Sequence, residues 1–185
     1  GTILGAEQEQ WLAEGLDASR AAWNVLAQPI GIGRVDRAPG EVMAYSMDQW
    51  PGYEANRQRL LRFFAARPKL NPIVLTGDIH TNWANNLQVN EQDPDDPVVA
   101  TEFVGTSVSS GGNGSERLKD AESVYAENPF VKFYNAERGY VSCELTPRQW
   151  ISRYRTVPYV EKPGAPVVTR RSFVVERDRP GLNEA

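Results

Sequence analysis

The sequence predicts a mixed α/β fold, in which helices flank a layered β-structure that continues into a C-terminal antiparallel meander. The first half alternates the two periodicities, with helices expected over residues 6–18 and 53–67 and strands over 23–28 and 73–75. The second half holds runs rich in β-branched and aromatic residues whose partial alternation suits a sheet with one covered face. These runs span residues 98–104, 139–145, 150–157 and 172–176. Together the patterns indicate half of a larger layered sandwich.

Composition places the chain among globular proteins of single-domain length. It has 185 residues, of which 41% are hydrophobic and five are tryptophan, so it can bury a core. The net charge of −4 provides no basic footprint for nucleic acid, and no apolar run has the length that spans a bilayer. The single cysteine, Cys143, allows no internal disulfide. Because it shares a strand face with Val141 and Leu145, we expect it to be packed among apolar residues.

The first helix is expected over residues 6–18, where acidic residues near the start suit a helix N-terminus. One helical face carries Gln8, Trp11, Leu12, Gly15, Leu16 and Ser19. The strand over 23–28 is stopped by Pro29, which leaves Gln28 at its exit. Two interpretations of Gln28 stay open. It is a weak contact to a metal or phosphate, or it hydrogen-bonds the backbone of the loop that follows.

A long irregular segment over residues 29–52 is rich in glycine, proline and charge. Loops of this length in compact domains are usually functional or mobile. Asp48, Trp50 and Tyr53 close the segment and lead into the helix over 53–67. The apolar stripe of that helix is Tyr53, Leu60, Leu61 and Phe64. Its arginines are interpreted as a solvated face rather than as a phosphate-binding patch.

The chain is organised around the stretch from Asn71 to Ala84. An apolar run, Ile73-Val74-Leu75, reads as a buried strand and is followed by Gly77, Asp78 and His80, the only histidine. If strand geometry persists past Gly77, positions 78 and 80 point to the same side. A carboxylate and an imidazole are both metal-ligand groups, and strand ends of layered α/β folds are frequent ligand sites. The alternative is structural, with a hydrogen-bonded histidine and an aspartate that closes a turn.

Residues 105–114 follow a strand and are crowded with glycines and hydroxyls that could cradle a phosphate oxygen. The segment lacks the lysine and the spacing of a nucleotide P-loop, and an ordinary surface loop is the alternative. A serine hydrolase is disfavoured, because Gly105-Thr-Ser-Val-Ser lacks the final glycine of a nucleophile elbow.

Several segments together resemble one family. Thr76-Gly-Asp-Ile-His-Thr-Asn-Trp83 is similar to the T-G-D-x-H-x-x-W segment of the alkaline phosphatase D (PhoD) family of metallophosphatases. Further matching segments occur in order along the chain, at residues 3–12, 23–28, 48–53, 100–112, 131–135, 138–140 and 173–176. The resemblance covers nearly the whole chain and implies part of a metallophosphatase-like β-sandwich, periplasmic or extracellular in location.

The resemblance implies a metal-dependent phosphoesterase, either a phosphatase or a phosphodiesterase, that uses iron and calcium. It makes Asp78 and His80 the metal ligands and catalytic residues. Possible substrate contacts or supporting residues are Gln28, Asp48, Asn82, Trp83 and Glu102. The competing hypothesis is a non-catalytic globular piece in which the site is inactive.

The resemblance also implies that the family's site takes ligands from an upstream half, which includes aspartates, an asparagine, a tyrosine and a cysteine. We therefore expect residues 1–177 to be the C-terminal portion of a PhoD-like catalytic domain and residues 178–185 to be a polar tail. One histidine and one neighbouring carboxylate are too few for a two-metal site. The expected partners are thus a phosphate ester and an upstream companion segment.

Overall fold

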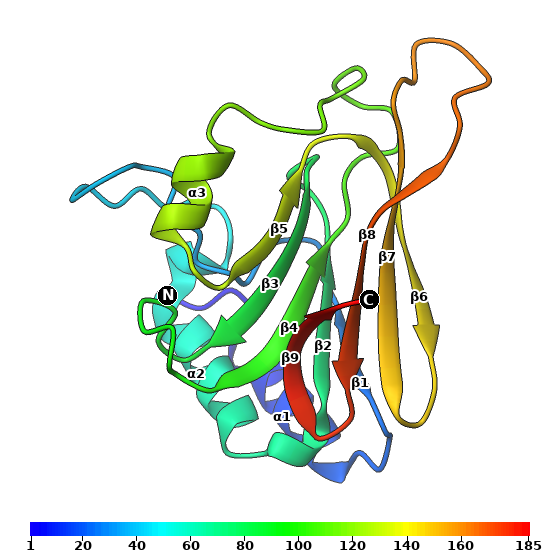
Figure 1. The fold of residues 1–185 in the computed structure, drawn as a ribbon. Helices are drawn as coiled ribbons and strands as arrows, with labels where there is room; N and C mark the ends of the chain where they lie inside the picture. Colours follow the sequence, from blue (N-terminus) through cyan, green and yellow to red (C-terminus); the bar gives the residue numbers. More distant parts are fainter.

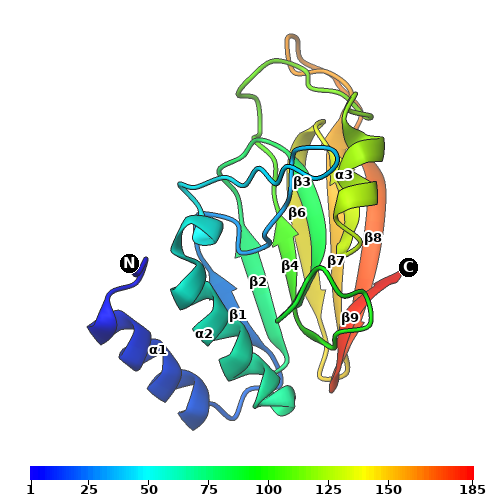
Figure 2. The ribbon, with the colours of Figure 1, turned by 90° about the vertical axis from the view of Figure 1, so that its left-hand side faces the viewer.

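The computed structural model describes all residues, 1–185, and arranges them in three layers. Two β-sheets pack face to face, and the helices α1 and α2 cover the outer face of the first sheet (Figures 1 and 2). The first sheet has the strand order β1-β2-β4-β3-β5 and the second has the order β6-β7-β8-β9. The mixed α/β class with a terminal antiparallel meander is confirmed.

The first sheet combines parallel and antiparallel pairs. Strands β1 (Asn24–Ala27), β2 (Pro72–Thr76) and β4 (Val98–Val104) run parallel to one another. Strands β3 (Asn82–Gln88) and β5 (Val131–Asn135) complete the sheet, and β3 is antiparallel to both of its neighbours. The sheet is covered on both faces, which explains why β4 reads as a nearly continuous buried run.

The second sheet is a meander of four antiparallel strands. It comprises β6 (Arg138–Leu145), β7 (Gln149–Val157), β8 (Val168–Glu176) and β9 (Arg179–Glu184). Alternate residues of β7 are buried, as expected for a sheet that covers a core with one face. Residues 179–184 fall in the predicted polar tail, and the structure pairs them with β8 as strand β9.

The helices are α1 (Ala6–Ala18), α2 (Glu54–Ala65) and the short α3 (Ala121–Glu127). Two 3₁₀ turns, Trp50–Tyr53 and Pro68–Leu70, flank α2, so the α-helix begins one residue later than predicted. Leu60, Leu61 and Phe64 are buried as expected. On the helical face named for α1, Leu16 is buried whereas Trp11 is 69% exposed. None of the helices has both the length and the apolar character needed to cross a membrane.

Three hydrophobic clusters hold the layers together. The first lies between α1, α2 and the outer face of the first sheet, where Leu61 and Phe64 pack with Val74. The second fills the space between the sheets, where Ile73 packs with residues of the meander. Neighbouring residues of β2 therefore serve opposite faces of one sheet. The third cluster lies under α3 and includes Trp83.

Cys143 differs from its expected environment. It lies on β6, an end strand of the second sheet, and is exposed rather than packed in the core. Leu145, on the same strand face, is 50% exposed. The alternation of this strand is as predicted, and Cys143 shares its face with buried Ser152 of β7, but β6 lies at the edge of the sheet, where the core covers that face only in part.

Candidate functional site

The carboxyl ends of the three parallel strands meet at one edge of the first sheet. The backbone hydrogen bonds between these strands continue for one residue past the strand ends. Gln28 N–H, after β1, donates to Leu75 O at 3.0 Å, and Gly105 N–H, after β4, donates to Thr76 O at 2.9 Å. In the same way Gly77 N–H, after β2, donates to Pro29 O at 3.1 Å. The segments that follow β1, β2 and β4 therefore start side by side, and this is the edge at which α/β sheets usually bind ligands.

The chain turns sharply after β2 instead of continuing as a strand. Ile79 N–H donates to Gly77 O at 2.9 Å, and both Asp78 and His80 have left-handed backbones, with φ of 71° and 53°. The expectation that strand geometry persists past Gly77 is therefore wrong. The physical reason is that β2 must reverse into antiparallel β3 within a few residues, and aspartate and histidine tolerate left-handed φ better than most residues.

Asp78 and His80 occupy this turn with their side chains exposed. Neither side chain hydrogen-bonds within the protein, so an oxygen donor and an imidazole are free for a ligand. No group of three or more His, Cys, Asp and Glu side chains lies together in the chain. By residue type Asp78 and His80 therefore fit a metal as two members of a ligand set, and no third His, Cys, Asp or Glu side chain lies with them.

Asn82 joins the turn to the loop after β4. It is fully buried, its side-chain oxygen accepts from Thr106 N–H at 3.2 Å, and its amide nitrogen donates to Asn135 Oδ1 at 3.0 Å and to Glu137 O at 3.2 Å. Its polar atoms are thus occupied inside the protein. Asn82 lies beneath the turn as a support rather than as an open donor.

Trp83 packs under the same turn. Its ring stacks on Tyr134 with centroids 3.9 Å apart, and its indole N–H donates to Thr81 Oγ1 at 2.6 Å. The side chain is only 1% exposed, and the guanidinium of Arg37 lies 5.2 Å from its ring centroid. The indole N–H therefore ties the turn to the third hydrophobic cluster.

Glu102 is buried in the sheet, below the strand ends. Its carboxylate accepts from Ile32 N–H at 2.6 Å, from Gly33 N–H at 3.1 Å and from Asn85 Nδ2 at 2.9 Å. Burial raises the pKa of Glu102, and these three donors together with the charge of Arg57 oppose that rise. The carboxylate holds the start of the long segment that follows β1.

Gln28 and Asp48 lie on that segment. The amide nitrogen of Gln28 donates to Ile30 O, and its amide oxygen accepts from the indole N–H of Trp50 at 2.9 Å. Asp48 is exposed and accepts from Ser46 Oγ at 2.7 Å. Gln28 thus links both ends of the segment. The structure does not bring Asp48 into a ligand group with Asp78 and His80.

The hydroxyls of the loop at residues 105–114 are also partly occupied. Thr106 Oγ1 donates to His80 O at 3.0 Å, and Ser107 Oγ donates to Ser110 O at 2.7 Å. Both side chains thus have hydrogen-bond partners within the protein. Sequence reasoning assigned no role to Arg138, whose guanidinium donates both to His80 O and to this loop. The available signal was an arginine at a strand start, inside a matching segment.

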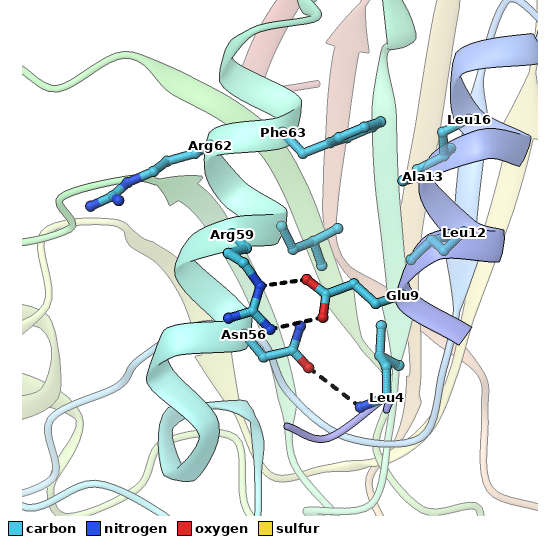
Figure 3. A pocket seen from close by; sticks show the side chains of 10 residues that line it. Leu4, Glu9, Leu12, Ala13, Leu16, Asn56, Arg59, Arg62 and Phe63 are labelled. Carbon is cyan, nitrogen blue, oxygen red and sulfur yellow. Dashed lines mark hydrogen bonds and ion pairs between the residues drawn. The ribbon is translucent and has the colours of Figure 1, made fainter. Parts of the chain in front are cut away.

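An apolar groove of about 400 Å³ lies elsewhere, between α1 and α2 (Figure 3). Its charged groups are dominated by the pair of Arg59 and Glu9, whose Nε and Oε1 atoms are 2.6 Å apart. The residues that line it include none of those at the strand ends. The groove is therefore separate from the Asp78–His80 turn.

Comparison with known proteins identifies the family. The protein-family model described as "PhoD-like phosphatase" matches residues 1–154 of this chain. The chain belongs to the PhoD-like phosphatase family. It is 45% identical to alkaline phosphatase D of Bacillus subtilis (strain 168) over 183 residues, which is 99% of this chain and 31% of that protein. A solved structure described as "Structure of PhoD" matches with a TM-score of 0.94 and 45% identity.

These matches define the extent of the likeness. The solved PhoD structure covers 100% of this chain, whereas the chain covers 35% of that structure. The chain thus spans about a third of the PhoD proteins it matches. The fold predicted from the resemblance is confirmed, because both sheets and all helices fall within the matched range.

Proposed function

We propose that this chain supplies part of the active site of a metal-dependent phosphoesterase that hydrolyses phosphate monoesters or diesters. The observation that carries the proposal is the pair Asp78 and His80. Their side chains are exposed and free of internal hydrogen bonds at the shared end of three parallel strands. Membership of the PhoD-like phosphatase family supports the reaction class.

Asp78 and His80 are the residues that would hold metal ions, by resemblance iron and calcium. A carboxylate suits calcium and an imidazole suits iron. When bound, such ions polarise a phosphoryl oxygen and lower the pKa of a bound water. The chain's own residues orient the two ligands, since Trp83 and Asn82 pack beneath the turn and bond to its neighbours.

The ligand count leads to a second part of the proposal. Even one catalytic zinc takes about three protein ligands, and two-metal sites need more. With no third His, Cys, Asp or Glu beside Asp78 and His80, the chain depends on a companion segment for activity. In this proposal residues 1–177 are one portion of a PhoD-like catalytic domain. The alternative, an inactive globular piece, rests on the same incomplete ligand set.

The test compares the chain alone with the chain plus its complement. Residues 1–185 are refolded with iron and calcium and assayed with p-nitrophenyl phosphate and bis-p-nitrophenyl phosphate. The assay is repeated with the part of the Bacillus subtilis protein that this chain does not match. We expect hydrolysis only in the second case. Metal-dependent hydrolysis by the chain alone would overturn the companion requirement, and inactivity in both cases would favour the inactive piece.

The ligand assignment has its own variants. In the complemented protein, His80→Ala should lower bound iron and turnover together, and Asp78→Asn should lower calcium occupancy. Asp95→Asn is the matched control, because exposed Asp95 lies in the loop between β3 and β4, at the opposite end of β4 from the Asp78–His80 turn. Unchanged metal content in His80→Ala, or full activity in Asp78→Asn, would contradict the assignment.

The resemblance also leads us to propose a periplasmic or extracellular location. Fractionation of cells that express the natural protein tests it. Recovery in the cytoplasmic fraction would contradict the proposal.

A further inference from the structure

Arg138 is the first residue of β6 and is only 6% exposed. Its guanidinium donates to four acceptors. Nη1 reaches His80 O at 2.6 Å and Thr106 Oγ1 at 3.3 Å, Nε reaches Gly112 O at 2.8 Å, and Nη2 reaches Gly111 O at 3.2 Å. Every acceptor is neutral, and no carboxylate lies within ion-pair distance of Arg138. An ion pair therefore does not account for this buried cation.

One of these bonds falls on the backbone of the candidate metal-binding turn. His80 O accepts from Arg138 at 2.6 Å and from Thr106 Oγ1 at 3.0 Å, so its peptide plane is held from two directions. Both Asp78 and His80 are left-handed, a conformation that costs about 1–2 kcal/mol per residue unless the surroundings enforce it. Hydrogen bonds from a charged donor are roughly twice as strong as neutral ones, so Arg138 is suited to enforce it.

The other bonds fall on the glycine-rich loop after β4. Gly111 and Gly114 have φ of 81° and 73°, which disfavours side chains at both positions. A Cβ at Gly111 would lie 3.2 Å from the Nη2 atom of Arg138, and one at Gly114 would clash with Ala136 O. The glycines thus let the loop backbone close around the guanidinium. Close packing of the backbone against Arg138 and Ala136 thus accounts for Gly111 and Gly114.

We propose that Arg138 is a positioning residue, whose fork of donors fastens the Asp78–His80 turn to the 105–114 loop so that both free side chains are presented in one arrangement. It acts through His80 and touches neither metal nor substrate. Its catalytic consequence rests on the proposed function, whereas its effect on the turn does not.

The single histidine makes the turn directly observable. In the complemented protein, with isotope labels only in this chain, His80 provides the only labelled imidazole signals, and the indole N–H signals of the five tryptophans report whether the fold is intact. We expect one sharp set of imidazole signals in the wild type. In Arg138→Met we expect broadened or multiple sets while the indole signals of Trp23 and Trp150, which are bonded elsewhere, stay in place.

Two further variants separate geometry from charge and from folding. Arg138→Lys keeps the charge but cannot reproduce the fork, so it should resemble Arg138→Met. Thr106→Val removes the second donor to His80 O and should cause a smaller change of the same kind. Arg153→Met, which breaks a surface contact with Glu144 at 2.9 Å, is the control and should leave His80 unchanged.

A Co²⁺ titration links the turn to metal binding. Loss of a residue that orients a ligand typically weakens metal affinity by about 10- to 100-fold. We expect that loss in Arg138→Met and not in Arg153→Met, followed on the His80 signals. An unchanged single set of imidazole signals in both Arg138 variants, or rescue by lysine, would overturn the positioning role. If Co²⁺ leaves the His80 signals of the wild type unchanged, the proposed function is wrong. The role of Arg138 is then still tested by the imidazole signals recorded without metal.

Discussion

At the scale of single residues, the structure separates side chains that are free to bind a ligand from side chains whose polar atoms already have partners in the protein. Asp78 and His80 are exposed on a turn with no internal partner, whereas the side chains of Asn82 and Glu102 are consumed by buried hydrogen bonds. Chemical identity alone would rank Glu102 beside Asp78 as a metal ligand. Both of its carboxylate oxygens are already occupied, by the backbone N–H groups of Ile32 and Gly33 and by the side-chain amide of Asn85.

The variant Glu102→Gln, which replaces one carboxylate oxygen by an NH₂ group, tests whether these hydrogen bonds stabilise the fold. A glutamine offers one acceptor oxygen, and its NH₂ group would face N–H donors that have no alternative partner. Leaving buried donors unpaired costs about 1–3 kcal/mol, so urea unfolding should show a loss of that size. Glu122→Gln, an exposed glutamate paired with exposed Arg117, is the control and should change stability by under about 0.5 kcal/mol. Equal stability of the two variants would mean that the hydrogen bonds from Ile32 and Gly33 to the Glu102 carboxylate do not stabilise the fold.

Trp83→Phe separates packing from substrate binding. The replacement shortens the stack on Tyr134 and removes the indole N–H that donates to Thr81. We expect a loss of about 2 kcal/mol in unfolding free energy, with little change in the Michaelis constant of the complemented protein. A large rise in the Michaelis constant at unchanged melting temperature would instead place the ring against the substrate.

At the scale of elements, a network of polar side chains stabilises the connection between β5 of the first sheet and β6 of the second. Glu137 lies between β5 and β6 and receives two bonds from Arg170 of β8, each at 2.7 Å. It also accepts from Asn135 Nδ2 at 3.0 Å and from Thr156 Oγ1 at 3.2 Å. Since Asn135 in turn bonds Asn82, this crossing supports the strand that follows the Asp78–His80 turn.

The same network gives a pH dependence with a definite sign. Burial raises the pKa of Glu137, but hydrogen bonds from Arg170 and Asn135 outweigh it, and the net shift is downward from 4.5. The ionised form therefore stabilises the fold above the unfolded pKa, and this contribution disappears as pH falls through the lowered folded pKa. Glu137→Gln should destabilise the chain at pH 7, and its difference from wild type should shrink in acid below about pH 4.5.

The measurement is the urea midpoint as a function of pH. Glu116→Gln is a matched control, because exposed Glu116 bonds the same Arg170, at 2.8 Å. Its effect should be small at every pH, as for surface pairs in general. A constant difference between Glu137→Gln and wild type down to pH 3 would contradict the linkage.

At the scale of the whole molecule, both sheets end in strands without a second neighbour. β1 ends the first sheet and β6 ends the second, and both carry exposed apolar residues such as Val25 (43% exposed) and Leu145 (50%). Unpaired strand edges recruit other strands. The chain alone should therefore self-associate or be weakly stable, and its complement should relieve this.

Analytical ultracentrifugation of residues 1–185 over a range of concentrations measures the association. Val25→Lys places a charge on β1 and should reduce it. Lys69→Arg, a conservative change at an exposed residue, is the control. A stable monomer at all concentrations, unaffected by the complement, would show that the edges need no partner.

The local pattern of the sequence determined the elements whose signals lie within a few residues. Helix α1 matches residues 6–18 and strand β4 matches residues 98–104, because periodicity and propensity are local properties. The pattern also located Asp78 and His80 next to a strand end. Strand β3 was missed, since its asparagines are poor strand formers. They are stable there because Asn82, Asn85 and Asn86 find partners in distant segments.

Only the tertiary structure decided how the candidate site is built. The sequence left open whether strand geometry persists past Gly77 to His80. In the structure the chain turns left-handed there, and Arg138, 58 residues further on, donates a hydrogen bond to His80 O. Such a bond has no local signature, because a left-handed aspartate or histidine is unfavourable until a distant donor holds it. The burial of Glu102 likewise follows from Ile32 and Gly33, about 70 residues earlier, which turned a possible ligand into a support. Residue types thus defined which groups could act, and long-range contacts decided which of them stayed free.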